Sequence, residues 1–121
     1  MNNIETYISI AKAEAWKSDY KYKLGALVLD GNRIVGKGYN KTNVHPYLSR
    51  RYGYFSRHSE CEAILKAAGR GDVLIVVRVR KGDGEISCSK PCARCLTFAK
   101  DYGIKKIYYV DWEGNIQYIK L

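Results

Sequence analysis

Apolar and polar residues follow two periods along the chain, one typical of helices and one typical of strands. Residues 4–17 place apolar side chains at nearly helical spacing, which predicts an amphipathic first helix. Residues 24–29 form an apolar run typical of a buried strand, and residues 33–39 return as a second strand after a Gly-containing turn. The polar stretch 40–57 contains a proline and a glycine and is interpreted as a loop.

The second half of the chain continues the alternation of helices and strands. A helix is predicted over about 59–69, where Gly69 suits its C-terminal end, and a second one over about 91–102. Strands are predicted over 73–79, 105–111 and 116–121. The order α-β-β-α-β-α-β-β indicates an α/β fold, a mixed sheet with helices packed on it. A tight turn between the last two strands predicts a C-terminal antiparallel β-hairpin.

Length and composition support one folded unit. A chain of 121 residues that is 46% apolar suits a single domain, 1–121, and contains neither repeats nor a linker-like stretch. Its apolar runs are far shorter than the roughly 18 residues that span a bilayer, so no membrane partner is expected. The N-terminus lacks the features of a secretory signal, and a soluble, cytoplasmic protein is the expectation.

The chain is strongly basic. It has 21 Lys and Arg against 12 Asp and Glu, a formal charge of +9, which favours phosphate-bearing partners. Residues 41–57 contain cations such as Arg57 and rings such as Tyr54, and no acidic residue. Cations for phosphates and rings for base stacking are typical of a nucleic-acid groove. A solvated, tyrosine-rich loop would have the same composition, so both interpretations stay open.

The cysteines indicate metal or redox chemistry. Three of the four lie between residues 88 and 95, and Cys92 and Cys95 form a Cys-x-x-Cys pair. Disulfides between distant elements are not expected, because the cytosol keeps thiols reduced.

Two fragments, His58-Ser59-Glu60 and Pro91-Cys92-Ala93-Arg94-Cys95, fall at the starts of predicted helices. The positive end of a helix dipole favours thiolates, so both cysteines are expected in the form that binds metal. With His58 they give zinc three protein ligands and leave a fourth position for water, as in catalytic sites. Zinc lowers the pKa of bound water to about 7. Glu60 is two residues from His58 but is not itself a metal ligand. Its carboxylate can take a proton from that water and give it to an amino group of the substrate, which then leaves as ammonia.

The two fragments together resemble the zinc signature of the cytidine/deoxycytidylate deaminase superfamily. The resemblance extends to the segments 38–40, 60–64 and 103–109 and so covers nearly the whole chain. It implies a three-layer α/β/α cytidine deaminase-like fold, with a five-stranded mixed sheet and helices on both faces. It also implies one Zn²⁺ per chain and an enzyme that hydrolyses a C–N bond of a cyclic amidine.

The resemblance also implies a substrate site. Asn40 ends a strand at the position where the family's asparagine contacts the substrate. Ser59 stands where family members more often have alanine, and its small size and backbone N–H predict little change. The expected substrate-binding residues are Asn40, Ser59, His45, Tyr54 and Arg57. A loop histidine beside a proline, such as His45, more often lies on the surface than in a site, so a place in the substrate pocket is the less favoured of its two interpretations.

Other roles for these residues remain open. Cys88 could complete a closed Cys₃His zinc site that is purely structural, although a strand-edge cysteine is more often packing material. Cys92 and Cys95 could instead form a thioredoxin-like redox pair. Cys61 is expected in the core, and Arg78 and Arg80 are expected on one exposed face of a strand.

The sequence is consistent with three candidate functions. The first is zinc-dependent deamination of a cytosine base in a nucleoside or nucleotide, with dCMP converted to dUMP and ammonia as the leading example. The second is deamination of cytosine in single-stranded DNA, or of a base in RNA, which the basic, aromatic 41–57 segment favours. The third is a non-catalytic, zinc-stabilised nucleic-acid-binding module, against which an intact Glu60 argues. Relatives are often oligomers, so a homo-oligomer is possible.

Overall fold

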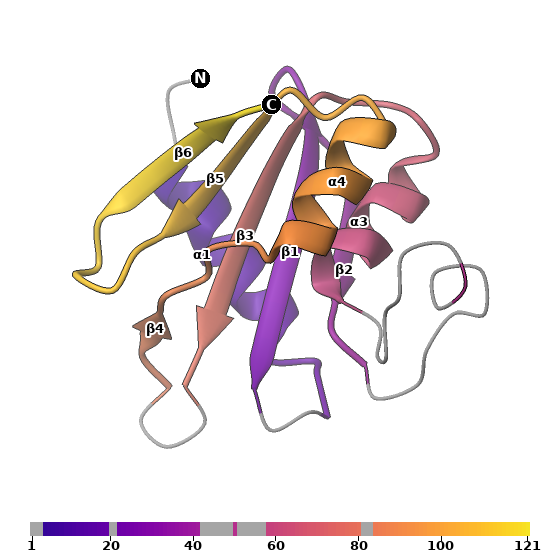
Figure 1. The fold of residues 1–121 in the computed structure, drawn as a ribbon. Coiled ribbons are helices and arrows are strands. Elements are labelled where there is room, and N and C mark those ends of the chain that lie inside the picture. The colour runs from indigo at the N-terminus through magenta and orange to yellow at the C-terminus, as the bar shows by residue number, and fades with distance from the viewer. Residues whose placement is uncertain (1–3, 20–21, 42–49, 51–57, 81–83) are drawn as a thin grey trace.

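The structure is a computed structural model that describes residues 4–19, 22–41, 50, 58–80 and 84–121. The predicted order of elements is confirmed in these residues, with one short strand added (Figure 1). The helices are α1 (Ile4–Ala15), α3 (Ser59–Ala67) and α4 (Ala93–Asp101). The strands are β1 (Lys23–Asp30), β2 (Arg33–Tyr39), β3 (Val73–Val79), β4 (Ile86–Ser87), β5 (Lys106–Val110) and β6 (Ile116–Lys120).

The strands form one mixed sheet. Five of them run in the order β2-β1-β3-β5-β6, and the two-residue β4 pairs with the end of β3. β3 and β5 are parallel, whereas the β1–β2, β1–β3, β3–β4 and β5–β6 pairs are antiparallel. The crossover between the two parallel strands contains α4, as such connections require. The predicted C-terminal hairpin is confirmed in β5 and β6.

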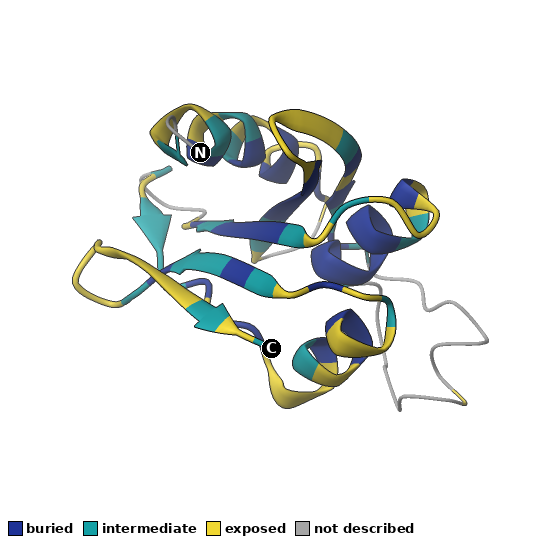
Figure 2. Cartoon of the chain, turned by 90° about the horizontal axis from the view of Figure 1, so that it is seen from above, coloured by how far each residue is buried: buried dark blue, intermediate teal, exposed yellow. Residues whose placement is uncertain are grey.

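The sheet carries helices on both faces, as Figure 2 shows. On one face, Ile8, Ala11 and Ala15 of α1 pack against alternate residues of β1 and β3. On the other face, α3 and α4 pack against the intervening residues, with Phe98 of α4 fully buried among them. Strands buried on both faces need long apolar runs, which explains the uninterrupted hydrophobicity of β1 and β3. The three-layer α/β/α arrangement is therefore confirmed.

Two glycines let α3 lie directly on β2. A Cβ atom on Gly36 would lie 2.2 Å from the carbonyl oxygen of Ala63, and one on Gly38 would lie 2.6 Å from the amide nitrogen of Ala63. Only residues without a Cβ allow backbones to approach this closely. The close packing brings the start of α3 to the end of β2, beside Asn40.

One expected surface is only partly exposed. Arg80 is exposed as predicted, but Arg78 is half-buried, and its Nε atom is fully covered. The expectation was wrong for Arg78 because Tyr22 lies over its guanidinium, 4.6 Å from the ring centroid. Among the described helices, none is both long and apolar enough to cross a membrane.

Candidate metal and active site

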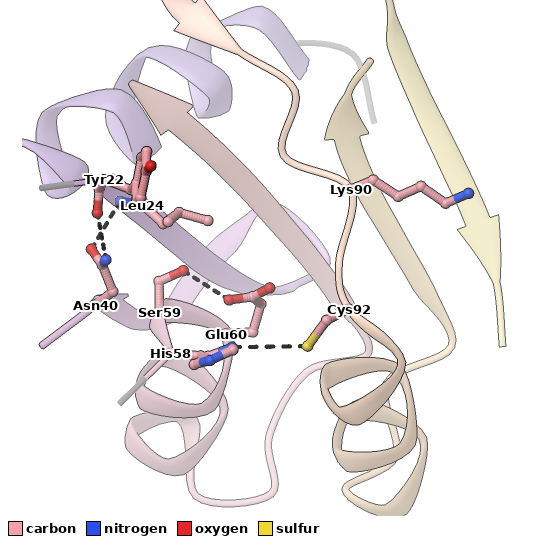
Figure 3. Close-up of a pocket in the computed structure, with 8 residues that line it drawn as sticks. All are labelled: Tyr22, Leu24, Asn40, His58, Ser59, Glu60, Lys90 and Cys92. Carbon is pink, nitrogen blue, oxygen red and sulfur yellow. Dashed lines mark hydrogen bonds between the residues drawn. The ribbon is translucent and has the colours of Figure 1, made fainter. Parts of the chain in front are cut away.

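His58 lies immediately before α3, and its backbone is extended (φ −85°, ψ 147°). This N-cap position favours Ser, Thr, Asp or Asn, whose side chains accept a hydrogen bond from the first turn of the helix. The His58 side chain makes no such capping bond. The imidazole is half-buried and faces the cysteines of α4 instead (Figure 3). The N-cap position of α3 therefore carries a metal-binding side chain in place of one that would make a capping hydrogen bond.

The cysteine pair lies at the start of α4. Cys92 is the N-cap residue, again extended (φ −74°, ψ 166°) and without a side-chain cap, and it is exposed. Cys95 lies in the first turn and is fully buried. Helix α4 begins at Ala93, two residues after the start predicted at Pro91, and a difference of one or two residues is usual for helix boundaries. The first turns of α3 and α4 thus present one imidazole and two sulfur atoms to the same space.

The spacing of these three side chains fits a tetrahedral metal ion. His58 Nδ1 lies 3.2 Å from Cys95 Sγ and 3.9 Å from Cys92 Sγ. All three groups can offer ligand atoms within 4.8 Å of one another. Ligand bonds of 2.0–2.1 Å for nitrogen and 2.3 Å for sulfur at tetrahedral angles require N···S separations of about 3.6 Å. The observed distances lie on either side of that value, so the donor set fits Zn²⁺ without a large rearrangement.

The two cysteines of the cluster differ in protonation when no metal ion is bound. The Sγ of Cys92 accepts a hydrogen bond from Cys95, and this contact, with the nearby His58, lowers the pKa of Cys92 to about 4. The same proton is held by Cys95, whose pKa is raised well above 9.0 by contacts with Cys61 and Cys92 and by burial. Without a metal ion the pair therefore shares one buried proton, whereas the expectation of two thiolates concerns the metal-bound form and stays a prediction.

The pKa of His58 also reflects its neighbours. Burial alone would lower this pKa, but the contact with Cys92 and the charge of Glu60 outweigh burial and raise it above 6.5. A zinc ion at this position would favour the deprotonated imidazole and thiolates, because ligands must lose their protons to bind metal.

Glu60 lies in the first turn of α3 with its carboxylate in the pocket. It is 3% exposed, and Ser59 Oγ donates a hydrogen bond to its Oε1 atom at 3.0 Å. Figure 3 shows Glu60 between Ser59 and the His58–Cys92 pair. It is not part of the metal-binding group formed by His58, Cys92 and Cys95. A buried carboxylate beside a metal site, but not in it, has the position of a proton carrier.

Asn40 also lines this pocket, and its amide is held by backbone groups. Leu24 N–H donates to Asn40 Oδ1 at 2.9 Å, and Asn40 Nδ2 donates to the carbonyl oxygen of Tyr22. Ser18 Oγ donates to the backbone carbonyl of Asn40 at 2.8 Å. The asparagine therefore joins the ends of β1 and β2 at the pocket wall, in addition to any contact with substrate.

The pocket has a volume of about 250 Å³. Its described lining consists of Tyr22, Leu24, Asn40, His58, Ser59, Glu60, Lys90 and Cys92 (Figure 3). Of these, Tyr22, Leu24 and Lys90 were not predicted. Leu24 and Tyr22 could have been found only from the pairing of β1 with Asn40, which the linear sequence does not contain. Lys90 directly precedes the cysteine motif, and its position there was a usable signal.

The remaining candidate residues lie either outside the described residues or outside the metal-binding group. His45, Tyr54 and Arg57 lie outside the described residues. Cys88 is half-buried and outside the metal-binding group, and Cys61 is fully buried in the core as expected. All four cysteines are free, so Cys92 and Cys95 do not form a disulfide. The closed Cys₃His site is not the arrangement that these side chains adopt.

Three ligands at two helix starts, an adjacent buried carboxylate and an open pocket define a zinc-dependent hydrolase site. The chain belongs to the cytidine and deoxycytidylate deaminase zinc-binding family, whose model matches residues 1–111. The protein is accordingly a hydrolytic deaminase, and His58, Cys92 and Cys95 fit its one zinc ion.

Solved structures support the fold. A cytidine deaminase from Burkholderia pseudomallei is 21% identical, with a TM-score of 0.70 over 96% of this chain and 91% of that one. A cytidine deaminase from Mycobacterium leprae is 25% identical, with a TM-score of 0.65 over 98% and 94%. A dCMP deaminase from the cyanophage S-TIM5 is 24% identical, with a TM-score of 0.63 over 93% and 86%. Among curated proteins, no sequence matches significantly.

Proposed function

We propose that the protein deaminates the cytosine base of a nucleoside or nucleotide, with dCMP converted to dUMP and ammonia as the preferred reaction. The single observation that carries this proposal is the buried Glu60 carboxylate, which faces a pocket that also contains the metal-binding His58 and Cys92. A purely structural zinc site has no use for such a group.

The pocket suits a single base. Its volume of about 250 Å³ lies below the roughly 300–1,000 Å³ of sites that enclose whole drug-sized ligands. It can enclose a pyrimidine ring, with Leu24 as an apolar wall, while the rest of a nucleotide extends out of it. Two of the similar solved structures are those of a cytidine deaminase and a dCMP deaminase, which is consistent with a cytosine ring as the occupant.

Glu60 then carries protons. When bound, zinc activates a water molecule at neutral pH by lowering its pKa to about 7. The Glu60 carboxylate accepts one proton of the attacking water and gives it to the ring nitrogen N3. It then accepts the proton of the new hydroxyl group at C4 and gives it to the amino group, which leaves as ammonia while a carbonyl remains at C4. Ser59 fixes one carboxylate oxygen through its 3.0 Å hydrogen bond and leaves the other for this transfer.

The phosphate preference rests on charge. The formal charge of +9 favours an anionic substrate. Lys90 lines the pocket, but its side chain is exposed and its ammonium group points away from His58 and Glu60 (Figure 3), so the charge argument does not depend on it. The same charge favours a second candidate, deamination of cytosine in single-stranded DNA or of a base in RNA. A polynucleotide that contacts several phosphates should lose affinity steeply with salt, with a log–log slope of about −0.7 per contact.

The test is ammonia release from the zinc-loaded protein with cytidine, deoxycytidine, their monophosphates, and single-stranded DNA and RNA. The proposal predicts turnover of dCMP with a shallow dependence on salt. Turnover of polynucleotides alone would favour the second candidate. A protein that binds zinc but releases no ammonia from any of these compounds would be a binding module, and the proposed function would be wrong.

A further inference from the structure

A second cavity lies beside the catalytic pocket and has no role in the chemistry described above. Its volume is about 500 Å³, twice that of the catalytic pocket. The described residues that line it are Tyr22, Arg78, Arg80, Ile86, Ser87, Cys88 and Trp112. It therefore combines two guanidinium groups with two large rings, and its described lining contains no carboxylate.

Three observations show that the two cavities lie next to each other. Tyr22 lines both of them. Leu24 of the catalytic pocket and Arg78 of the second cavity are direct cross-strand partners in β1 and β3, so their side chains lie next to each other on one face of the sheet. Along the chain, Cys88 lines the second cavity, and Lys90, two residues later, lines the catalytic pocket.

Arg78 is held in place to receive an anion. Its guanidinium carbon lies 4.6 Å from the centroid of the Tyr22 ring, a stacking contact that restricts the side chain. Its Nε atom is buried and has no hydrogen-bond partner among the described residues. Because Nε is covered, the groups of Arg78 that an anion in the cavity can contact are the terminal nitrogens of its guanidinium. The planar fork of arginine matches the oxygens of a phosphate.

The rings add a second kind of contact. Trp112 is 79% exposed and Tyr22 is 46% exposed, although both are large aromatic side chains. Exposed rings next to guanidinium groups bind flat, anionic ligands by stacking and by charge. The cavity is also larger than a phosphate group alone needs.

We propose that the Arg78–Trp112 cavity is the subsite for a nucleotide phosphate, and that the enzyme consequently prefers nucleotides to nucleosides. Cytosine occupies the pocket at Glu60, the sugar passes Tyr22, and the phosphate contacts Arg78 and Arg80. This assignment rests on the proposed deamination, and it names residues outside the zinc motifs as the source of substrate preference.

The experiment compares kcat/KM for dCMP and for deoxycytidine in the zinc-loaded wild type, Arg78→Gln and Arg80→Gln. The matched control is Arg33→Gln, which removes the same charge at the exposed start of β2, at the opposite end of that strand from Asn40. We expect each cavity variant to lose about tenfold or more for dCMP and to keep its rate on deoxycytidine within about twofold. Arg33→Gln should leave the ratio of the two substrates unchanged.

Two further measurements keep the result interpretable. Arg78→Lys preserves the charge of this half-buried position if Arg78→Gln unfolds, and it should lose part of the dCMP preference because lysine lacks the fork. Binding of dCMP and of deoxycytidine to Glu60→Gln, measured by calorimetry, reports on the subsite without turnover. Loss of dCMP binding on adding the Arg78 change supports the subsite even if no deamination is found.

The opposite results overturn the assignment. If the protein deaminates deoxycytidine as well as dCMP, or if the Arg78 and Arg80 variants lose no more on dCMP than Arg33→Gln does, the cavity is not a phosphate subsite, while the deaminase function stands. A short single-stranded oligodeoxynucleotide serves as the third substrate. If its dependence on Arg78 and Trp112 exceeds that of dCMP, the phosphate belongs to a polynucleotide.

Discussion

The contact between β2 and α3 allows a prediction about how packing controls the active site. A Cβ atom added at Gly38 would lie 2.6 Å from the amide nitrogen of Ala63, 2.6 Å from Glu62 Cβ and 2.7 Å from the carbonyl oxygen of Ser59. Ordinary contacts begin at 3.4 Å, so the Gly38→Ala substitution requires a separation of about 0.8 Å between the strand and the start of the helix. Glu60 lies in that part of α3, and His58 lies immediately before it.

Gly38→Ala should therefore affect stability and activity together. Overpacking of this kind costs about 1–3 kcal/mol of unfolding free energy. A misplacement of about 1 Å in a catalytic group can cost on the order of 100-fold in rate, so we expect at least a tenfold loss of kcat. Stability is measured by urea unfolding of the zinc-loaded protein, and kcat by ammonia release at a temperature where the variant remains folded.

Gly25→Ala is the matched control. A Cβ atom there would lie 2.1 Å from the carbonyl oxygen of Ala11, a clash at least as severe, but it faces α1 on the opposite side of the sheet. We expect a similar loss of stability with kcat close to that of the wild type. The reasoning is refuted if Gly38→Ala keeps full activity, or if both variants lose kcat equally.

Three other predictions follow from the same structure. Cys92→Ala should lose bound zinc and thermal stability, whereas Cys88→Ser should keep both; metal analysis and thermal unfolding check this, and equal zinc loss would make Cys88 a ligand. Phe98→Ala should destabilise the fold by about 3–5 kcal/mol in urea unfolding, because its ring is fully buried; a change under 1 kcal/mol would contradict this packing. The pKa of Asp111 is lowered, chiefly by hydrogen bonds from Asn115 and Gln117, so its stabilising effect is present above pH 3.8 and disappears as the pH falls through the lowered pKa. The stability difference between wild type and Asp111→Ala should shrink in acid, and a difference that persists at the lowest pH would refute the linkage.

The fold was predictable because each element has a strong local pattern. The uninterrupted apolar runs of β1 and β3 require burial on both faces, and the structure places helices on both. Strand β4 was not predicted as a separate element because two residues have no period. Its pairing with β3 joins two segments of the chain, and the local pattern of neither segment specifies that contact.

The metal-binding residues were predictable because their spacing within each motif is local. The wall formed by Tyr22 and Leu24 was not, since it arises from hydrogen bonds between the Asn40 side-chain amide and the backbone of Tyr22 and Leu24. Arg78 was placed on an exposed face by its alternation with Val79. The alternation is correct, but the sequence does not show that Tyr22 and β4 cover this end of the strand. Cys95 is expected as a thiolate in the metal-bound site, whereas burial beside Cys61 raises its pKa in the metal-free protein.

The most direct test of the account is a comparison of Glu60→Gln with Glu62→Gln. Both carboxylates are buried on α3, but Glu60 faces the pocket whereas Glu62 forms an ion pair with Lys41 at 3.2 Å. Zinc content and ammonia release from dCMP are measured on the same samples. Glu60→Gln should keep one zinc ion per chain and lose about 100-fold or more in turnover, while Glu62→Gln should retain most of its activity. Loss of zinc from Glu60→Gln, or turnover equal to that of the wild type, would contradict the assignment of Glu60 as the proton carrier.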